Sequence, residues 1–317
     1  MRKVFAVAAA LALLGLGGVA QAITIETVAI GNAGNAADTA DNSGNPAGQG
    51  SVAYNYNIGK YEVTAGQYTA FLNAVANVSD TYALYNTKMW SNSYGCKIQQ
   101  TSISGGYSYS VASDYANRPV TYVSYWDSCR FANWLGNGQG SGGTETGAYT
   151  IPDGYNGTDG RTIQRNVGWT GWAVTSEDEW YKAAYYKGGG LYSLYANGTS
   201  TAPVAGTTGT NYDVAIGHTW DGSTNGALEQ NDTKDMMGNV WEWNEALVYD
   251  GYAYRGLRGG SFDYDSVVLQ TSFRAGRTAS DEYEHFGFRV SQVPEPSSII
   301  ALLGGLAGLI GLRRRYV

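Results

Sequence analysis

The stretch KDMMGNVWEWNE, which runs from Lys234 to Glu245, decides the fold of this 317-residue chain. Side chains alternate between the two faces of a strand, so Trp241 and Trp243 are predicted to share one face while Glu242 takes the other. On the simplest interpretation, the tryptophans belong to the core and Glu242 is solvated. The stretch holds no obvious nucleophile, which favours a structural role over catalysis.

The same stretch has the elements of a calcium site. Calcium ions take roughly six to eight oxygen ligands, drawn from carboxylates and backbone carbonyls. A tight turn at Gly238 would expose carbonyl oxygens, and the carboxylates of Asp235 and Glu242 lie on either side of it. Spacing alone leaves the core strand and the calcium site open as interpretations.

The composition favours a loop-rich globular domain. The chain has 43% hydrophobic residues but only 15% charged ones, together with 44 Gly, 26 Tyr and 9 Trp. Short strands, turns and aromatic surfaces suit this composition better than long charged helices. A net charge of −7 and a pI near 4.9 argue against nucleic acid as a partner. We expect one α+β domain over residues 23–292, because no βαβ rhythm and no internal repeat is visible.

The first 22 residues have the pattern of a signal peptide. Basic Arg2–Lys3 precede an apolar run from Val4 to Val19, and an A-x-A cleavage site follows at Ala20–Ala22. The chain is therefore predicted to be exported, with a mature end near Ile23.

Residues 293–317 have the pattern of a second signal. Pro294–Pro296 precede an apolar segment from Ile299 to Leu312, and Arg313–Arg315 follow it. About 14 apolar residues are few for a stable membrane span, which needs roughly 20, although a plain C-terminal anchor stays an alternative. The order resembles the PEP-CTERM sorting signal of Gram-negative bacteria. The resemblance implies recognition by an exosortase, transient membrane association, and delivery to the cell envelope or an extracellular polysaccharide matrix.

Three helices are predicted from capping boxes, in which a Ser or Thr is followed three residues later by a residue that bonds back to it. The pairs are Thr64 with Gln67, Ser124 with Asp127, and Ser176 with Glu179. The second helix is predicted to stop at Gly136 and the third before Gly188. In the third helix, Asp178 and Lys182 are spaced to form an i,i+4 ion pair.

Several motifs resemble the formylglycine-generating-enzyme (sulfatase-modifying factor) family. They are YEVTAGQYTAFLNAVA, RPVTYVSYWDSCRFANWL, WAVTSEDEWYKAAYY, DMMGNVWEW, LRGGSF and GFRV, in the family's order, between about Tyr54 and Val290. The resemblance implies a C-type-lectin-like fold with little regular secondary structure. It also implies structural Ca²⁺ held by side chains of Asp235 and Glu242 and by carbonyls of Gly238 and Val240. For a second calcium site, Asn211 is a weak candidate, because its spacing departs from the family pattern.

Active members of this family bind copper through a pair of cysteines between R-G-G-S and G-F-R, because soft thiolates suit Cu(I). Here that segment contains Arg274 and Arg277, which resemble family arginines, but it has no cysteine. The sequence therefore argues against a copper site. The only two cysteines are Cys96 and Cys129. They are candidates for a structural disulfide in an oxidising compartment or for two buried thiols, and less so for a redox pair.

Other chemistry has little support. Iron-dependent relatives need a cluster of histidines, whereas His218 and His285 are far apart and are expected to be ordinary surface residues. The segment after the GGS turn at Ser261 is acidic and is expected to form a solvated face, with contact to a cation or a substrate as the alternative. Its members are Asp263, Asp265, Asp281, Glu282 and Glu284.

Two functions follow from these observations. The first is an exported, calcium-stabilised binding or structural module that lacks the catalytic cysteines and contacts exopolysaccharide or a surface protein through Tyr-rich loops. The alternative is a metal-dependent oxidase of the same family that converts a sulfatase cysteine to formylglycine.

Overall fold

The computed structural model describes residues 22–40, 47–152, 154–249 and 251–293. Nearly all of the predicted signal peptide and of the sorting signal therefore lies outside the described residues. Within them, no helix is long and apolar enough to span a membrane.

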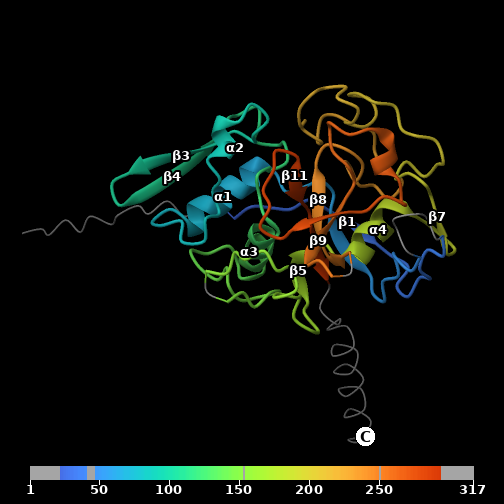
Figure 1. The fold of residues 1–317 in the computed structure, drawn as a ribbon, viewed down its shortest axis with the longest axis horizontal. Helices are drawn as coiled ribbons and strands as arrows, with labels where there is room; N and C mark the ends of the chain where they lie inside the picture. The colour runs from blue at the N-terminus through green and yellow to red at the C-terminus, as the bar shows by residue number, and fades with distance from the viewer. Residues whose placement is uncertain (1–21, 41–46, 153, 250, 294–317) are drawn as a thin grey trace, which may run out of the picture.

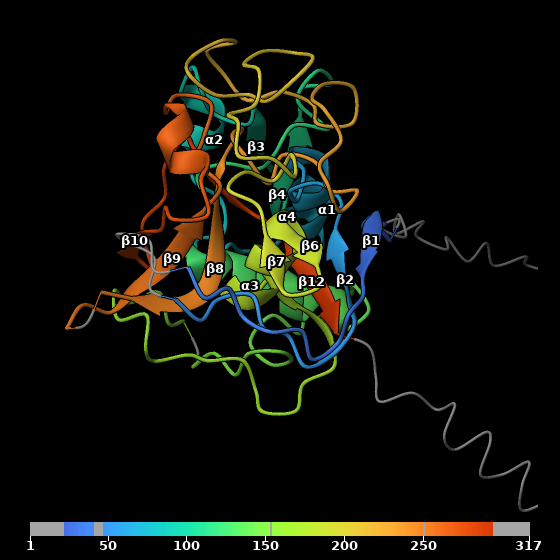
Figure 2. The ribbon, with the colours of Figure 1, turned by 90° about the vertical axis from the view of Figure 1, so that its right-hand side faces the viewer.

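Two four-stranded sheets organise the domain (Figure 1). The first is wholly antiparallel, and its order is β1 (Thr27–Ile30), β2 (Tyr56–Gly59), β12 (Val290–Val293), β5 (Gly171–Val174). The second has the order β10 (Ala275–Thr278), β9 (Tyr254–Arg258), β8 (Trp241–Val248), β11 (Phe286–Phe288), with β8 and β11 parallel. Figure 2 shows β8 and β9 on one side of the molecule and β1, β2 and β12 on the other, with α4 in view between them.

The remaining elements are short. Two hairpins are formed by β3 (Ile98–Ile103) with β4 (Gly106–Val111) and by β6 (Tyr186–Gly188) with β7 (Leu191–Tyr192). The first hairpin extends away from the body of the domain (Figure 1). A short helix α2 (Lys88–Ser91) and a 3-10 turn η1 (Ser266–Leu269) lie between the longer elements. The expectation of a loop-rich α+β domain is confirmed.

All three capping boxes form as the sequence predicts. They begin α1 (Ala65–Val75), α3 (Tyr125–Gly136) and α4 (Glu177–Tyr185). The expected pair between Asp178 and Lys182 is wrong. The Asp178 carboxylate instead accepts from the Gly50 N–H at 2.7 Å, and the Lys182 ammonium donates to the Asn32 carbonyl at 2.9 Å. Both side chains therefore tether the long N-terminal loop to α4.

The core between the helices and the sheets is aromatic. Phe71 of α1 and Phe131 of α3 have ring centroids 5.4 Å apart, and Phe131 lies 5.4 Å from Phe288 of β11. On β8, Trp243 is fully buried, but so are Glu242 and Asn244 on the opposite face. The interpretation of Glu242 as a solvated residue is therefore wrong, because both faces of this strand are covered.

Candidate functional site

The turn before β8 is conformationally unusual. Asp235, Gly238 and Asn239 all have left-handed backbones, with φ of 57°, 77° and 60°. A Cβ at Gly238 would lie 2.2 Å from the carbonyl oxygen of Asn211, so only glycine fits there. The Asn239 N–H donates to the same carbonyl at 2.8 Å. The turn is thus pressed against the loop that contains Asn211.

Glu242, which follows this turn, is paired with Arg289. The guanidinium Nε donates to Glu242 Oε2 and Nη2 donates to Oε1, both at 2.7 Å. Its remaining hydrogen bonds go to backbone carbonyls, namely Gly59 at 2.8 Å, Lys60 at 3.2 Å and Lys234 at 2.9 Å. Trp180 of α4 donates to Glu242 Oε2 at 2.8 Å. Arg289 therefore acts as an internal cation within a shell of five oxygens.

Three more carboxylates are buried nearby and carry no ion pair within the described residues. They are Glu62, Glu229 and Asp235, each at most 7% exposed. Asp235 accepts one bifurcated hydrogen bond from Trp220 Nε1, which lies 3.1 Å from Oδ1 and 3.0 Å from Oδ2. Burial raises the pKa of Asp235 to about 7 and that of Glu229 to about 8, although the positive charge of Arg289 opposes the shift of both groups. The pKa of Glu62 is raised well above its ordinary value for the same reason. This cluster therefore holds more acidic groups than Arg289 can neutralise.

The calcium prediction fits this geometry only in part. Glu242 does not fit, because Arg289 engages both of its oxygens. Calcium held by Asp235 and the carbonyl groups of Gly238 and Val240 stays a prediction, which the buried acidic groups without an ion pair support. Among the described residues, no group of three or more His, Cys, Asp or Glu side chains is arranged to hold a metal. At the second candidate site, the side-chain oxygen of Asn211 is buried and lacks a hydrogen-bond partner.

The structure contains no disulfide between Cys96 and Cys129. Both are fully buried free thiols, so the bridge considered from the sequence is corrected in favour of its alternative. The two thiols have separate neighbours: Cys96 Sγ donates to the Thr121 carbonyl at 3.6 Å, and Cys129 lies beside Tyr125. Burial raises the pKa of each thiol above its ordinary value. Neither side chain can readily supply a thiolate to copper or to a substrate.

The two histidines differ. His218 is exposed, as expected, and its ring nitrogen lies 3.1 Å from Arg118. His285 is not an ordinary surface residue. Its ring stacks on Tyr283 at a centroid distance of 5.9 Å and meets Phe286 edge-on at 4.9 Å. Burial lowers its pKa, although the nearby charge of Asp263 opposes that effect.

A pocket of about 200 Å³ lies over the sheet that contains β8, β9, β10 and β11. It is formed largely by the segment between R-G-G-S and G-F-R, where the resemblance places the missing cysteines. Its lining residues are Trp241, Tyr249, Leu257, Tyr264, Phe273, Arg274, Ala275, Gly276, Arg277 and Phe286. No pattern in the sequence predicted this pocket, apart from the resemblance of its two arginines to family arginines.

The two pocket arginines have different partners. Arg274 Nη2 forms an ion pair with Glu177 Oε2 at 2.5 Å, and Glu177 also pairs with Arg258 at 2.7 Å. Arg277 is exposed, and its Nη1 donates only to the neighbouring Gly276 carbonyl at 3.1 Å. No carboxylate in the described part of the chain lies within ion-pair distance of Arg277.

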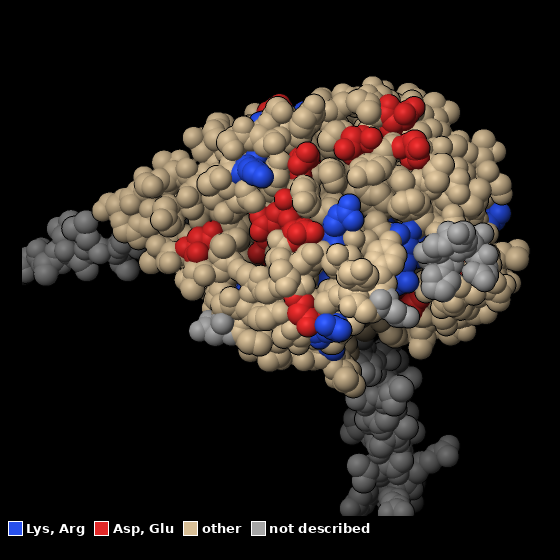
Figure 3. Space-filling model, in the orientation of Figure 1, with Lys and Arg blue, Asp and Glu red and all other residues tan. Residues whose placement is uncertain are grey.

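The acidic side chains near the pocket serve mainly local structure. Asp263 accepts from Ser261 at 2.6 Å, Asp265 caps η1 through Val267 at 2.9 Å, and Glu284 accepts from Tyr122 at 3.1 Å. Glu282 accepts from Asn86, and Asp281 is partly buried. They are therefore not simply a solvated face. Figure 3 shows an acidic patch beside basic side chains near the centre of the face in view.

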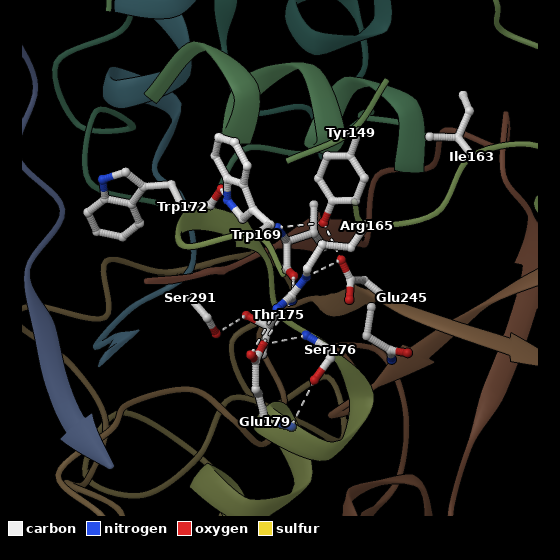
Figure 4. A network of polar contacts seen from close by, with 12 residues as sticks. Tyr149, Ile163, Arg165, Trp169, Trp172, Thr175, Ser176, Glu179, Glu245 and Ser291 are labelled. Carbon is white, nitrogen blue, oxygen red and sulfur yellow. Dashed lines mark hydrogen bonds and ion pairs between the residues drawn. The ribbon is translucent and has the colours of Figure 1, made fainter. Parts of the chain in front are cut away.

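A second polar network anchors the loop before β5 (Figure 4). Arg165 Nη1 contacts Glu179 Oε1 at 3.0 Å, and its Nε contacts Glu245 Oε1 at 2.8 Å. Tyr149 also donates to Glu245, and it accepts from the Val174 N–H at 3.0 Å. Arg165 thus connects α4 with β8. The network is assembled from residues distant in sequence, and its tight pairing indicates a structural role.

Comparisons with known proteins agree with this architecture. Residues 19–293 match the sequence model of the sulfatase-modifying factor enzyme 1-like domain, and residues 292–315 match that of the PEP-CTERM protein-sorting motif. No curated protein gives a significant match. Among solved structures, the chain is similar to CarF, with a TM-score of 0.57 and 22% identity over 85% of this chain and 98% of that one. It is also similar to variable protein 1 of Treponema denticola, with a TM-score of 0.54 and 19% identity over 87% and 98%.

The structural likenesses establish the fold, and the motif match indicates an exported protein at the cell surface that an exosortase recognises. The expected family resemblance and the expected sorting signal are both confirmed. Because the family's sequence model extends over most of the chain, from residue 19 to residue 293, this protein belongs to the sulfatase-modifying factor enzyme 1-like domain family.

Proposed function

We propose that this protein is a binding module without oxidase activity, exported to the cell envelope or the extracellular polysaccharide matrix. The observation that carries the proposal is the composition of the pocket. Where the resemblance implies a pair of copper-binding thiolates, the pocket instead has the aromatic rings of Tyr264 and Phe273. The only two thiols are buried elsewhere with separate neighbours. The site can therefore hold a ligand but lacks soft ligands for copper.

The rigid frame beneath the pocket supports a binding role. Arg289 and Arg165 tie the strands and α4 together through buried ion pairs, while loops such as 259–274 cover the sheet. Binding residues are often found on loops that a rigid scaffold positions. The matrix is a reasonable setting for such a module, because the sorting motif indicates the cell surface.

Calcium has a structural place in the proposal. A calcium ion beside Asp235, bound also by the carbonyls of Gly238 and Val240, would neutralise part of the buried negative charge. Glu242 would stay with Arg289. Calcium would thus stabilise the left-handed turn before β8 and take no part in ligand chemistry.

The function is tested with protein purified after expression of the full chain. We expect the folded protein to be retained on extracellular polysaccharide, or on a surface-protein fraction, from the bacterium that produces it naturally. Heat-unfolded protein should not be retained on either. Absence of binding to both fractions would refute the proposal.

The oxidase alternative is tested with copper, oxygen and a cysteine-containing sulfatase peptide. We expect no aldehyde by mass spectrometry, because neither thiol is accessible. Formation of formylglycine would overturn the assignment as a module without oxidase activity.

A further inference from the structure

The pocket over the second sheet has the size and walls of a site for one ring. Its volume of about 200 Å³ is smaller than the roughly 300–1,000 Å³ that is usual for drug-sized ligands. Trp241 meets Tyr264 edge-on at a centroid distance of 5.5 Å and lies 5.8 Å from Phe273. Tyr249, which is 51% exposed, stands at the mouth. The walls are therefore aromatic, and the Tyr249 ring is exposed although its hydroxyl donates to the Arg274 carbonyl at 3.1 Å.

Two basic side chains, Arg274 and Arg277, line the pocket where β10 begins and continues. Arg277 of β10 lies directly opposite Arg255 of β9 in the antiparallel register. Like charges in such a pair repel each other. Arg255 donates to the backbone carbonyls of Glu245 and Ile163, and no ion pair to a carboxylate is found for it within the described residues. Arg274 shares its single partner, Glu177, with Arg258. Of these arginines, Arg277 is the one that is exposed at the pocket and has no ion pair with a carboxylate of the described residues.

Acidic groups near Arg277 do not remove this charge. Asp281 interacts electrostatically with Arg277 but lies beyond ion-pair distance. Asp263 is held by Ser261, and its nearest basic group is His285, at 3.7 Å. Arg277 is the exposed guanidinium at the pocket, and a carboxylate of a ligand is the partner that its planar geometry suits.

From these observations we propose that the pocket binds a single acidic sugar unit, a pyranose ring that carries a carboxylate, within a polysaccharide. This inference rests on the proposed binding function and names its ligand class. The apolar face of the ring packs on Tyr249 and the pocket aromatics, and the carboxylate accepts hydrogen bonds from Arg277. An open mouth allows the rest of the polymer to extend into solvent.

Two variants and one control test the site. Arg277→Gln removes the guanidinium, and Tyr249→Ala removes the exposed ring. Lys187→Gln is the matched control, because Lys187 is exposed, lies on β6 outside the pocket, and changes the net charge equally. Binding of oligogalacturonate and of its neutral galactose counterpart is measured by calorimetry, and circular dichroism checks that each variant is folded.

We expect the acidic oligomer to bind at least about tenfold more tightly than the neutral one, and Arg277→Gln to remove that preference, since a hydrogen bond to a charged group is worth about this factor. Tyr249→Ala should weaken binding of both oligomers, and Lys187→Gln should change neither. The inference is overturned if the protein binds the two oligomers with equal affinity, or if folded Arg277→Gln keeps full affinity for the acidic one. If the protein still binds polysaccharide in that case, the proposed function stands. If the protein binds neither oligomer and no matrix fraction, both proposals fail.

Discussion

Replacement of Arg289 with methionine measures how much of the free energy of unfolding depends on one internal cation. Arg289→Met keeps an apolar stem of similar length but removes every hydrogen bond of the guanidinium. Of its side-chain donors, Glu242 would then keep the indole N–H of Trp180 at 2.8 Å. The carbonyl groups of Gly59, Lys60 and Lys234 would lose the guanidinium as a donor, although Lys60 would still accept from the Lys234 N–H. Glu242 is 0% exposed, so water cannot replace the lost partner.

The expected loss follows from these contacts. Breaking a buried ion pair by removing one partner typically destabilises a protein by about 3–5 kcal/mol. A domain of this size has a total stability of roughly 5–15 kcal/mol, so Arg289→Met should lose a large fraction of it. At about 2–4 °C per kcal/mol, the melting temperature should fall by roughly 10 °C.

The assay is urea unfolding followed by tryptophan fluorescence, with differential scanning calorimetry as a second measurement. Lys187→Met serves as the exposed control and should change little. The double variant Glu242→Gln with Arg289→Met should recover part of the loss, because the uncompensated charge is gone. A folded Arg289→Met protein within about 0.5 kcal/mol of the parent would refute the reasoning and show that another cation holds Glu242.

Three further predictions concern the buried acids and the thiols. Burial raises the pKa of Asp235 to about 7 and that of Glu229 to about 8 in the folded state. The contribution of these groups to the stability of the folded state is therefore fully present below about pH 4 and is lost as the pH rises through the raised pKa values. In calcium-free buffer the melting temperature should therefore fall as the pH rises toward about 8, and Asp235→Asn should flatten this slope. Calcium should raise the melting temperature more near pH 8 than near about pH 5.5, since it competes with protons for the same carboxylates. Equal melting temperatures with and without chelator at both pH values would contradict the calcium proposal. Cys96 and Cys129 should react with a thiol reagent only after denaturation, and rapid labelling of the folded protein would contradict their burial.

Local features of this fold could be predicted from sequence because their partners are three residues apart. Thr64, Ser124 and Ser176 each accept from the backbone N–H of the residue three positions later, as the capping boxes require. The β8 strand was also recognised from its alternation. The motif order additionally gave the family and the fold, which physical patterns alone would not have specified.

Features that depend on distant partners could not be predicted. Glu242 was expected to face solvent or calcium. Its partner Arg289 lies 47 residues later in the chain, and no local sequence pattern predicts this ion pair. The disulfide required a Cβ geometry that sequence cannot show, and the two cysteines came to lie among separate neighbours. The pocket was missed because its aromatic residues come from β8, β11 and two loops, which meet only in the folded chain.

The position of β12 has a consequence for how this protein matures. It is the last strand described, yet it lies inside the first sheet, bonded to β2 on one side and to β5 on the other. During export the chain emerges from its N-terminal end, so this sheet stays split until residues 290–293 have crossed. Arg289, which neutralises Glu242, arrives in the same final step. Completion of the fold therefore coincides with the appearance of the adjoining sorting motif at residues 292–315. A cut before Val290 would remove an interior strand along with that motif.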